Sequence, residues 1–424
     1  MKRITVALAL IFSLFVLLTV EMQVVKLAKA NFITEPTPPI PSAYIRFNGG
    51  IEPQTLPIQR SGDVYKFTGN IADCTLEIQR SNIVLDGAGF SLQGNGTGRG
   101  IALINVKNVT VKNVELRNFS SAFHIGSSSN NTLLGNNISK SVFGIYLISA
   151  SNTYLIGNKI TGNTVAIESQ YSNYTNVVEN QITENYNGIY LSSGENNFIV
   201  RNNITSYSGS GIEGSFLSNC SIMSNNIANG DVGILLSGSH CQQISIAKNT
   251  IMNNRAGIYL DMGTQYHNIF ENTIANNEYG INIFLSNSSM FYYNNLIDNQ
   301  KQVNMDFIQI GGRIVSGPPV PPPTFNFWNN DSKGNYWSDH NGTDINQDGI
   351  GDSYYAIDAN NIDRYPLMSP FDIENGTVVL PSHESQQLGF FQTGFDVTVA
   401  LIAIVVIAVG LLVYHKKRQR GRSS

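Results

Sequence analysis

The sequence repeats a short pattern every 22 to 24 residues, and this period constrains the fold more than any other feature. Each repeat contains a step made of a small residue followed by an apolar one. The small residues of these steps are Gly100, Ala122, Gly144, Ala166, Gly188, Gly211, Gly233, Gly257 and Gly280. A fixed period of this length is typical of a solenoid, in which each repeat packs against its neighbours along one axis.

Each step also shows a period of two. The first and third residues after the small one are mostly apolar, as Ile145 and Leu147 are after Gly144, and the residue between them, here Tyr146, varies. This alternation predicts a short strand with one buried face. A further apolar patch follows each step by about eleven residues, as at Leu155.

An asparagine recurs in the same rhythm, with an aliphatic residue two places after it. The members of this column are Asn136, Asn158, Asn180, Asn202, Asn225, Asn249, Asn272 and Asn294. We therefore expect three short strands and three turns in each coil, with Asn in a turn because it tolerates left-handed backbone. Coils stacked ~4.8 Å apart would let these amides hydrogen-bond to one another as a ladder.

Together these patterns predict an all-β fold, a right-handed single-stranded parallel β-helix of about ten coils of 22–24 residues. A leucine-rich repeat needs an LxxLxL register, and a calcium-binding roll needs Gly-Gly-x-Gly-x-Asp; neither pattern occurs here. A propeller blade is about twice as long as this repeat.

The composition excludes several classes of protein. Charged residues make up only 13% of the chain, so long helices with charged faces are not expected. The net charge is −4 and the middle of the chain has no basic block, which argues against a nucleic-acid partner. Three cysteines are too few for a disulfide framework.

Both ends of the chain carry apolar segments. Residues 1–30 join a basic start to an apolar run and a small-x-small site, which predicts a signal peptide; a retained N-terminal anchor is the alternative. Residues 397–414 form an uncharged run that is long enough for a transmembrane helix, and residues 415–424 are a basic tail. Because basic residues stay on the cytoplasmic side, we expect a single-pass cell-membrane protein with an extracellular body and a cytoplasmic C-terminus.

Proline-rich and polar stretches divide the body. Residues 31–80 are predicted as a Pro-rich linker and N-terminal cap, 81–310 as the β-helix repeats and 311–323 as a second Pro-rich linker. Residues 324–370 are predicted as a C-terminal cap module rich in Asp and Trp, and 371–396 as a juxtamembrane spacer.

The run SNIVLDGAG at residues 81–89, followed by the NxI and GIxL coils, resembles the NosD-type β-helix family. The similarity covers roughly residues 45 to 370. Segments 334–339 and 363–368 resemble archaeal surface members in particular. The resemblance implies a place among carbohydrate-binding proteins and sugar hydrolases. The family name derives from an accessory protein for copper-site maturation, so the resemblance also raises a copper-binding role. Fold alone assigns neither function.

The outward residues of the GIxL strands form the first candidate site. The residues that we expect to bind a ligand there are Tyr146, Glu168, Tyr190, Glu213, Tyr259 and Asn282. Aromatic faces beside carboxylates suit glycan binding. Glu168 and Glu213 lie two coils apart, ~9.6 Å, which is near the upper limit for the acid pair of an inverting glycosidase. A solvated strand face with Tyr chosen for its β-propensity is the alternative.

An acidic loop forms the second candidate site. Asp344, Asn346, Asp348 and Asp352 stand at the first, third, fifth and ninth positions of a loop with Gly349 at the sixth, a spacing typical of calcium loops. The twelfth position is Tyr rather than Glu, so Asp358 or Asp363 would have to supply the missing ligand. A cluster of turns that closes the cap is the alternative.

Soft-metal ligands form the third candidate site. Cys220, Met223, His240 and Cys241 lie on two consecutive coils and suit copper(I). A disulfide between the two cysteines or unrelated small core residues are the alternatives. Twelve Asn-x-Ser/Thr sequons begin at Asn95, Asn108, Asn118, Asn130, Asn137, Asn173, Asn203, Asn219, Asn287, Asn330, Asn341 and Asn375, so an exported chain could be a glycoprotein.

These observations favour a cell-surface β-helix protein that binds glycan or another surface polymer without catalysis and is held in the membrane by its C-terminal helix. A copper-binding accessory protein, a polysaccharide hydrolase that uses Glu168 and Glu213, and a structural spacer are the alternatives.

Overall fold

The structure is a computed structural model, and it describes residues 42–308 and 324–373. The predicted signal peptide, the linker at 311–323, the transmembrane segment, the basic tail and most of the spacer lie outside these ranges. The described residues up to Phe371 belong to one compact unit, and Asp372 and Ile373 are the described residues of a second. Within the described ranges, every regular element is a strand, and no helix that could cross a membrane is present.

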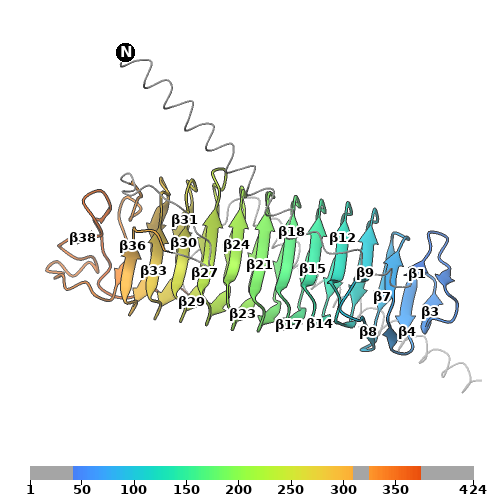
Figure 1. Cartoon of the computed structure of the whole chain (residues 1–424). Helices are drawn as coiled ribbons and strands as arrows, with labels where there is room; N and C mark the ends of the chain where they lie inside the picture. The colour runs from blue at the N-terminus through green and yellow to red at the C-terminus, as the bar shows by residue number, and fades with distance from the viewer. Residues whose placement is uncertain (1–41, 309–323, 374–424) are drawn as a thin grey trace, which may run out of the picture. The chain divides into compact units, whose positions relative to one another are not determined.

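The first unit is a right-handed parallel β-helix of about eleven turns built from three sheets (Figure 1). Sheet A has 13 strands, in the order β2 (Ile51–Glu52), β1 (Ser42–Ile45), β6 (Thr75–Ile78), β9 (Arg99–Ile104), β12 (Ser121–Gly126), β15 (Phe143–Ile148), β18 (Val165–Gln170), β21 (Asn187–Ser192), β24 (Ser210–Ser215), β27 (Val232–Ser237), β30 (Ala256–Leu260), β33 (Tyr279–Ile283) and β36 (Lys301–Asn304).

Sheets B and C have 12 strands each. Sheet B contains β3 (Ile58–Ser61), β4 (Val64–Phe67), β7 (Ile83–Asp86), β10 (Val109–Lys112), β13 (Thr132–Leu134), β16 (Tyr154–Ile156), β19 (Asn176–Val178), β22 (Phe198–Val200), β25 (Ser221–Met223), β28 (Ser245–Ala247), β31 (Asn268–Phe270) and β34 (Met290–Tyr292). Sheet C contains β37 (Tyr336–Trp337), β35 (Asn295–Ile297), β32 (Thr273–Ala275), β29 (Thr250–Met252), β26 (Asn226–Ala228), β23 (Asn203–Thr205), β20 (Gln181–Thr183), β17 (Lys159–Thr161), β14 (Asn137–Ser139), β11 (Glu115–Arg117), β8 (Ser91–Gln93) and β5 (Ile71–Ala72).

The stack begins before residue 81, where the sequence placed its start. Strand β4 already pairs in parallel with β7, and β1 with β6. Antiparallel pairs occur at the two ends of the described unit, where β1 meets β2, β3 meets β4, and β38 (Tyr355–Ala356) meets β39 (Ile362–Asp363). The predicted N-terminal cap therefore joins the solenoid directly.

The small residue of each step lies where consecutive coils approach most closely. A Cβ added to Gly188 would stand 2.2 Å from the carbonyl oxygen of Gly211. The aliphatic residues that follow, such as Ile189 and Leu191, point inward and are buried. The period that identified the fold thus reflects one close backbone contact per turn and a core that continues from coil to coil.

From β9 to β36 each coil turns at four corners, and a residue with left-handed backbone stands at each. In one coil these residues are Ser149, Asn152, Gly157 and Gly162, with φ values of 52°, 48°, 60° and 66°. The fourth corner arises because the segment between sheets A and B forms a short extra side of the predicted triangle. Single bridges such as Ser129 to Ser151 pair this segment with the same segment of the next coil. Asn, Gly and small polar residues recur at corners because they accept this conformation at low cost.

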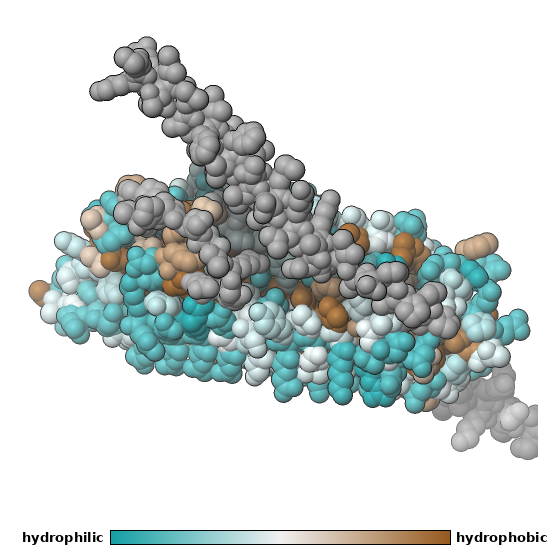
Figure 2. Space-filling model, in the orientation of Figure 1, coloured by the Kyte–Doolittle hydropathy of each residue, from teal (hydrophilic) through white to brown (hydrophobic). Residues whose placement is uncertain are grey.

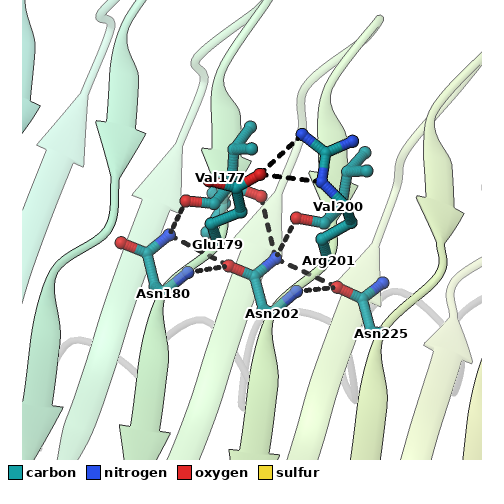
Figure 3. Close-up of polar contacts among 8 residues, drawn as sticks. Val177, Glu179, Asn180, Val200, Arg201, Asn202 and Asn225 are labelled. Atoms are coloured by element: carbon teal, nitrogen blue, oxygen red, sulfur yellow. Dashed lines mark hydrogen bonds and ion pairs between the residues drawn. The ribbon is translucent and has the colours of Figure 1, made fainter.

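The predicted asparagine ladder is present inside the stack (Figure 3). The Asn180 side-chain amide donates to Oδ1 of Asn202 at 2.9 Å, and Asn202 donates to Oδ1 of Asn225 at 3.0 Å. Asn202 also donates to the backbone carbonyl oxygens of Val177 and Val200. These bonds satisfy polar groups that the corner would otherwise bury without partners, which removes a large desolvation cost.

The C-terminal cap continues the solenoid. Asn294 donates to Asn335 at 2.9 Å, so the ladder crosses from the repeats into the cap. The buried carboxylate of Asp363 ends it by accepting from the backbone N–H of Asn335 at 2.7 Å and from the Trp337 indole at 2.9 Å. Trp328 and Trp337 belong to the same hydrophobic core as the coils. The cap therefore shares the core of the coils, and its two tryptophans extend that core.

Candidate functional site

The outward residues of sheet A form one file in direct register, as the sequence predicted. Consecutive strands place these residues side by side: Ala102, His124, Tyr146, Glu168, Tyr190, Glu213, Leu235, Tyr259, Asn282 and Asn304. Because parallel strands keep equivalent residues in line, the file presents one side chain from each coil along the axis.

The structure corrects the expectation that this whole file is exposed. His124, Tyr146 and Tyr190 are half-buried, whereas Glu168 and Glu213 are only 5% and 6% exposed. The accessible part of the file is therefore the rings of His124, Tyr146 and Tyr190, and the two carboxylates beside them are buried.

The C-terminal half of the file is buried and not accessible to solvent. Tyr259 is 1% exposed and belongs, with Leu235, Phe284 and Ile308, to a small hydrophobic cluster on the outer face of sheet A. Asn282 is fully buried and accepts a hydrogen bond from Asn304. Tyr259 and Asn282 are therefore closed to solvent here, because Ile308, after β36, packs on Tyr259 and Asn304 covers Asn282, and ligand binding by these two residues stays a prediction.

Hydrogen bonds connect the N-terminal half of the file to the neighbouring outward row. The Tyr146 hydroxyl donates to Oε1 of Gln170 at 3.3 Å, and the Gln170 amide donates to Oε1 of Glu168 at 2.6 Å. The rings of His124 and Tyr146 lie 5.3 Å apart between centroids, as do those of Phe143 and Tyr146. These contacts hold the aromatic row in one arrangement.

Burial sets the protonation of this face. It raises the pKa of Glu168, and the nearby charge of Glu213 raises it further. Burial and the positive charge of Arg99 lower the pKa of His124 to about 4, so this imidazole is neutral at pH 7. Burial also raises the pKa of Tyr146 and of Tyr190. The face therefore offers neutral hydroxyl and imidazole groups around two carboxyl groups.

The glycosidase alternative requires Glu168 and Glu213 to face one bond of a substrate. They lie on β18 and β24, with Tyr190 of β21 between them in register. Two strand spacings give a separation of roughly 9.6 Å, the wide end of the range for an inverting pair. Hydrolysis by these residues stays a prediction.

A groove at the corner between sheets C and A was not predicted. It has a volume of about 510 Å³ and is open to solvent. Lys140, Gly162 and Glu184 occupy equivalent left-handed positions in successive coils along it, with φ values of 54°, 66° and 58°. Val142 and Tyr186 form its exposed rim. The only sequence feature that indicates this groove is Gly162, which has no side chain, whereas the equivalent residues of the neighbouring coils have long polar ones.

The structure does not assemble the predicted copper ligands. Cys220 points inward, where its sulfur accepts the backbone N–H of Asn197 at 3.4 Å. Met223 alternates with the inward Ile222 on β25, and His240 is exposed. Cys241 is buried at a different corner, because Ser218 and Gln242 are aligned and the two cysteines are not. Both thiols are free, so the structure does not contain the disulfide that was the alternative to copper.

The acidic loop is folded around its own carboxylates. Asp344 accepts the backbone N–H groups of Asp348 at 3.1 Å and Gly349 at 2.9 Å, and Asp352 accepts that of Ile345 at 2.8 Å. Gly349 has a φ of 83°, as the sixth position of such a loop requires. Asp363 is buried against Asn335 and Trp337 instead of supplying a ligand. Calcium binding here stays a prediction, and no group of three or more His, Cys, Asp or Glu in the described ranges is arranged around a metal position.

Solved structures with similar coils come from several proteins. The A-module of a mannuronan C-5 epimerase of Azotobacter vinelandii is 16% identical, with a TM-score of 0.49, and the match covers 63% of this chain and 80% of that one. The surface adhesin PfbA of Streptococcus pneumoniae is 14% identical, with a TM-score of 0.44, and the match covers 56% and 80%. The periplasmic alginate epimerase AlgG is 14% identical, with a TM-score of 0.35, and the match covers 68% and 82%. No curated protein matches the chain.

A family model matches the repeats themselves. It is described as periplasmic copper-binding protein (NosD), and it matches residues 70–221 and 207–342, which together span more than half of the 424-residue chain. The matched region contains the asparagine ladder, the sheet A file and the first residues of the cap. The chain therefore belongs to the NosD family of parallel β-helix proteins.

Proposed function

We propose that this protein is a surface or periplasmic β-helix protein that binds a linear, uncharged glycan along the outer face of sheet A. The observation that carries the proposal is the file His124, Tyr146, Glu168, Tyr190 and Glu213, in register on five consecutive coils. A rigid row of similar contacts at a fixed interval suits a polymer with a repeating structure, because weak contacts add along it.

The chemistry of the face favours a sugar chain over other polymers. Aromatic side chains present apolar surface to the faces of pyranose rings, and the hydroxyl, amide and carboxyl groups beside them can exchange hydrogen bonds with sugar hydroxyls. Ser192 and Ser215 lie close enough to the Tyr190 hydroxyl to lower its pKa against the larger effect of burial, and they extend this polar row across the sheet. Figure 2 shows mostly hydrophilic residues on the visible described surface, with hydrophobic residues in small groups.

The charge of the file favours a neutral glycan. The file itself includes Glu168 and Glu213 but no Lys or Arg, and the cation whose charge acts on His124 and Tyr146 is Arg99, at the start of β9. A polyuronate would bring its own carboxylates close to these two groups in a partly desolvated site, and such like-charge contacts are unfavourable. We therefore expect neutral oligosaccharides to bind better than acidic ones of the same length.

The family description names copper, but the described residues do not fit a copper site of the predicted composition. Burial raises the pKa of the Cys220 thiol to about 12 and that of Cys241 to about 11, so both are protonated at neutral pH. Copper(I) binds thiolates, and Met223 and His240 do not share a face with either sulfur. No step of the proposed function uses a metal.

The test measures oligosaccharide binding by the full-length chain, purified in a mild detergent. Cellohexaose, mannohexaose and chitohexaose serve as neutral probes, and hexagalacturonate serves as the acidic probe, each titrated by calorimetry. At least one neutral probe should bind, and Tyr146→Ala should weaken it about tenfold, equivalent to about 1.4 kcal/mol. Tyr259→Phe is the matched control, because Tyr259 lies under Ile308.

Two results would reject the proposal. One is the absence of binding to every neutral probe, and the other is equal loss of affinity in the Tyr146 and Tyr259 variants. Reducing-end release from a bound probe, abolished by Glu168→Gln, would instead support the hydrolase alternative. A probe that stays intact while bound would support a purely binding role.

A further inference from the structure

The corner groove owes its hollow to one missing side chain. Asn118, Lys140, Gly162 and Glu184 stand at the same position in four successive coils, and only Gly162 has no side chain. A Cβ added there would meet no atom within 4 Å. The backbone of Gly162 therefore forms an open floor, with the side chains of Lys140 and Glu184 on either side along the axis.

The lining of the groove is balanced in charge and mixed in polarity. Lys140 can donate hydrogen bonds and Glu184 can accept them, and one positive and one negative group leave no net charge. The aromatic ring of Tyr186 is half exposed on the rim and provides one flat apolar surface. Asn118 donates from its amide nitrogen to the carbonyl oxygen of Gly94, so its side-chain oxygen is held at the end of the groove. This combination suits a neutral ligand with many hydroxyl groups.

The size of the groove fits the same ligand. Its volume of about 510 Å³ lies within the range of small-ligand sites, but its open shape cannot enclose an apolar molecule. A pyranose ring could stack on Tyr186 with its hydroxyl groups directed at Lys140 and Glu184. A charged polymer would be attracted by one of these two side chains and repelled by the other.

The groove and the sheet A file are parts of one surface. Val142 of the rim directly precedes Phe143, the first residue of β15, and the ring of Phe143 lies 5.3 Å from that of Tyr146 in the file. A branch or a bend of a glycan seated on the file can therefore reach the groove without crossing another coil.

From this geometry we infer that the corner groove is a second saccharide-binding subsite, which takes a neutral pyranose unit between Lys140 and Glu184 with Tyr186 as the stacking platform. The inference rests on the proposed function, because it assigns a further contact to the same class of ligand. The groove subsite differs in location from the site of the proposed function, since the groove lies at a corner of the coils and the file lies on sheet A.

The test uses substitutions that the corner backbone accepts. Gly162→Lys fills the floor of the groove with a lysine, a residue that already adopts the same left-handed conformation at Lys140. Tyr186→Ala removes the aromatic ring on which the sugar would stack. Asn276→Lys is the matched control for the first, because Asn276 has the same corner position in a distant coil, with a φ of 54°. Tyr266→Ala is the control for the second, because Tyr266 is 53% exposed, against 50% for Tyr186, and precedes β31 of sheet B, at a different corner in a distant coil. The full-length chain is titrated with the neutral hexasaccharides named above.

Gly162→Lys and Tyr186→Ala should each weaken the best-bound neutral probe at least fivefold. Asn276→Lys and Tyr266→Ala should bind like the wild type, and all four variants should keep its melting temperature within a few degrees. Tyr186→Trp adds a direct signal, because its fluorescence should change on addition of the probe even when Tyr146→Ala is also present.

The outcomes separate the two proposals. Loss of affinity in Tyr146→Ala together with wild-type affinity in both groove variants would overturn the groove subsite and leave the proposed function in place. A fluorescence change in the Tyr186→Trp, Tyr146→Ala double variant would support the groove even if the file contributes nothing. No change in fluorescence and no effect of either groove variant would overturn it.

Discussion

The ring of Tyr207 occupies the space that a side chain on Gly230 of the next coil would need. A Cβ on Gly230 would stand 1.9 Å from Cε2 of Tyr207, and the Tyr207 hydroxyl passes this glycine to donate to Oδ1 of Asn254, one coil further, at 2.7 Å. Asn185 and Asn254 hold the equivalent position in other coils. One tyrosine and one glycine therefore replace two rungs of a second polar ladder.

The first prediction follows from this pair. Gly230→Ala should destabilise the fold by about 1–3 kcal/mol, the usual cost of overpacking, because the added methyl displaces the Tyr207 ring and its bond to Asn254. Chemical denaturation measures the change. Gly126→Ala is the control, because a Cβ there meets its nearest atom at 3.6 Å. Equal stability of the two variants would contradict the close approach.

The second prediction concerns Asp363 and pH. Burial raises the pKa of this carboxyl to about 6 in the folded chain, against 3.8 when it is unperturbed. The folded state therefore binds more protons than the unfolded state between these values, so its contribution is fully present below about pH 4 and is lost as the pH rises to 6. The difference corresponds to about 3 kcal/mol.

The measurement compares the wild type with Asp363→Asn, which does not titrate. The melting temperature of the wild type relative to the variant should fall between pH 4 and pH 6 and then level off. A difference that is constant with pH, or that grows in favour of the wild type, would contradict the raised pKa.

The third prediction concerns the cysteines. With pKa values of about 12 and 11 and buried sulfurs, Cys220 and Cys241 should resist iodoacetamide at pH 8 in the native chain and react fully in denaturant. Mass spectrometry counts the modified thiols.

After copper(I) loading and dialysis, any retained metal should be unaffected by Cys220→Ser. Stoichiometric copper that disappears in that variant would show that the interior rearranges to bind it.

The fourth prediction concerns the acidic loop. If Asp344, Asp348 and Asp352 bind calcium, a calcium concentration 100 times the dissociation constant should stabilise the chain by about 2.7 kcal/mol, and chelation should remove the gain. Asp348→Ala should abolish the response, whereas Asp306→Ala, outside the loop, should keep it. A melting temperature that is independent of calcium would reject the site and leave the loop as a cluster of turns that closes the cap.

Much of the fold could be predicted because each coil repeats the same local rules. The Gly188 step, the inward Ile189 and the Asn202 corner all follow from residues within one period. The number of turns was underestimated because the first coils and the cap keep the hydrogen bonding but not the sequence pattern, as Asn335 shows by joining the ladder 41 residues after Asn294.

The site was predicted less well because it depends on the path of the chain between repeats. The file of Tyr146 and Glu168 follows from register alone. The burial of Tyr259 under Ile308 does not, because it requires the chain after β36 to turn back across sheet A. The two cysteines are out of alignment for a related reason: Cys220 and Cys241 are 21 residues apart, whereas the local repeat of 24 residues aligns Ser218 with Gln242.

Photochemical cross-linking tests glycan binding on sheet A most directly. The best-bound neutral hexasaccharide, carrying a diazirine at its reducing end, is irradiated with the full-length chain, and the modified peptides are mapped by mass spectrometry. The account predicts cross-links in β12, β15, β18 and β21, and their suppression by excess unlabelled probe. Cross-links confined to the outer faces of sheets B and C, or cross-links that unlabelled probe does not suppress, would contradict it.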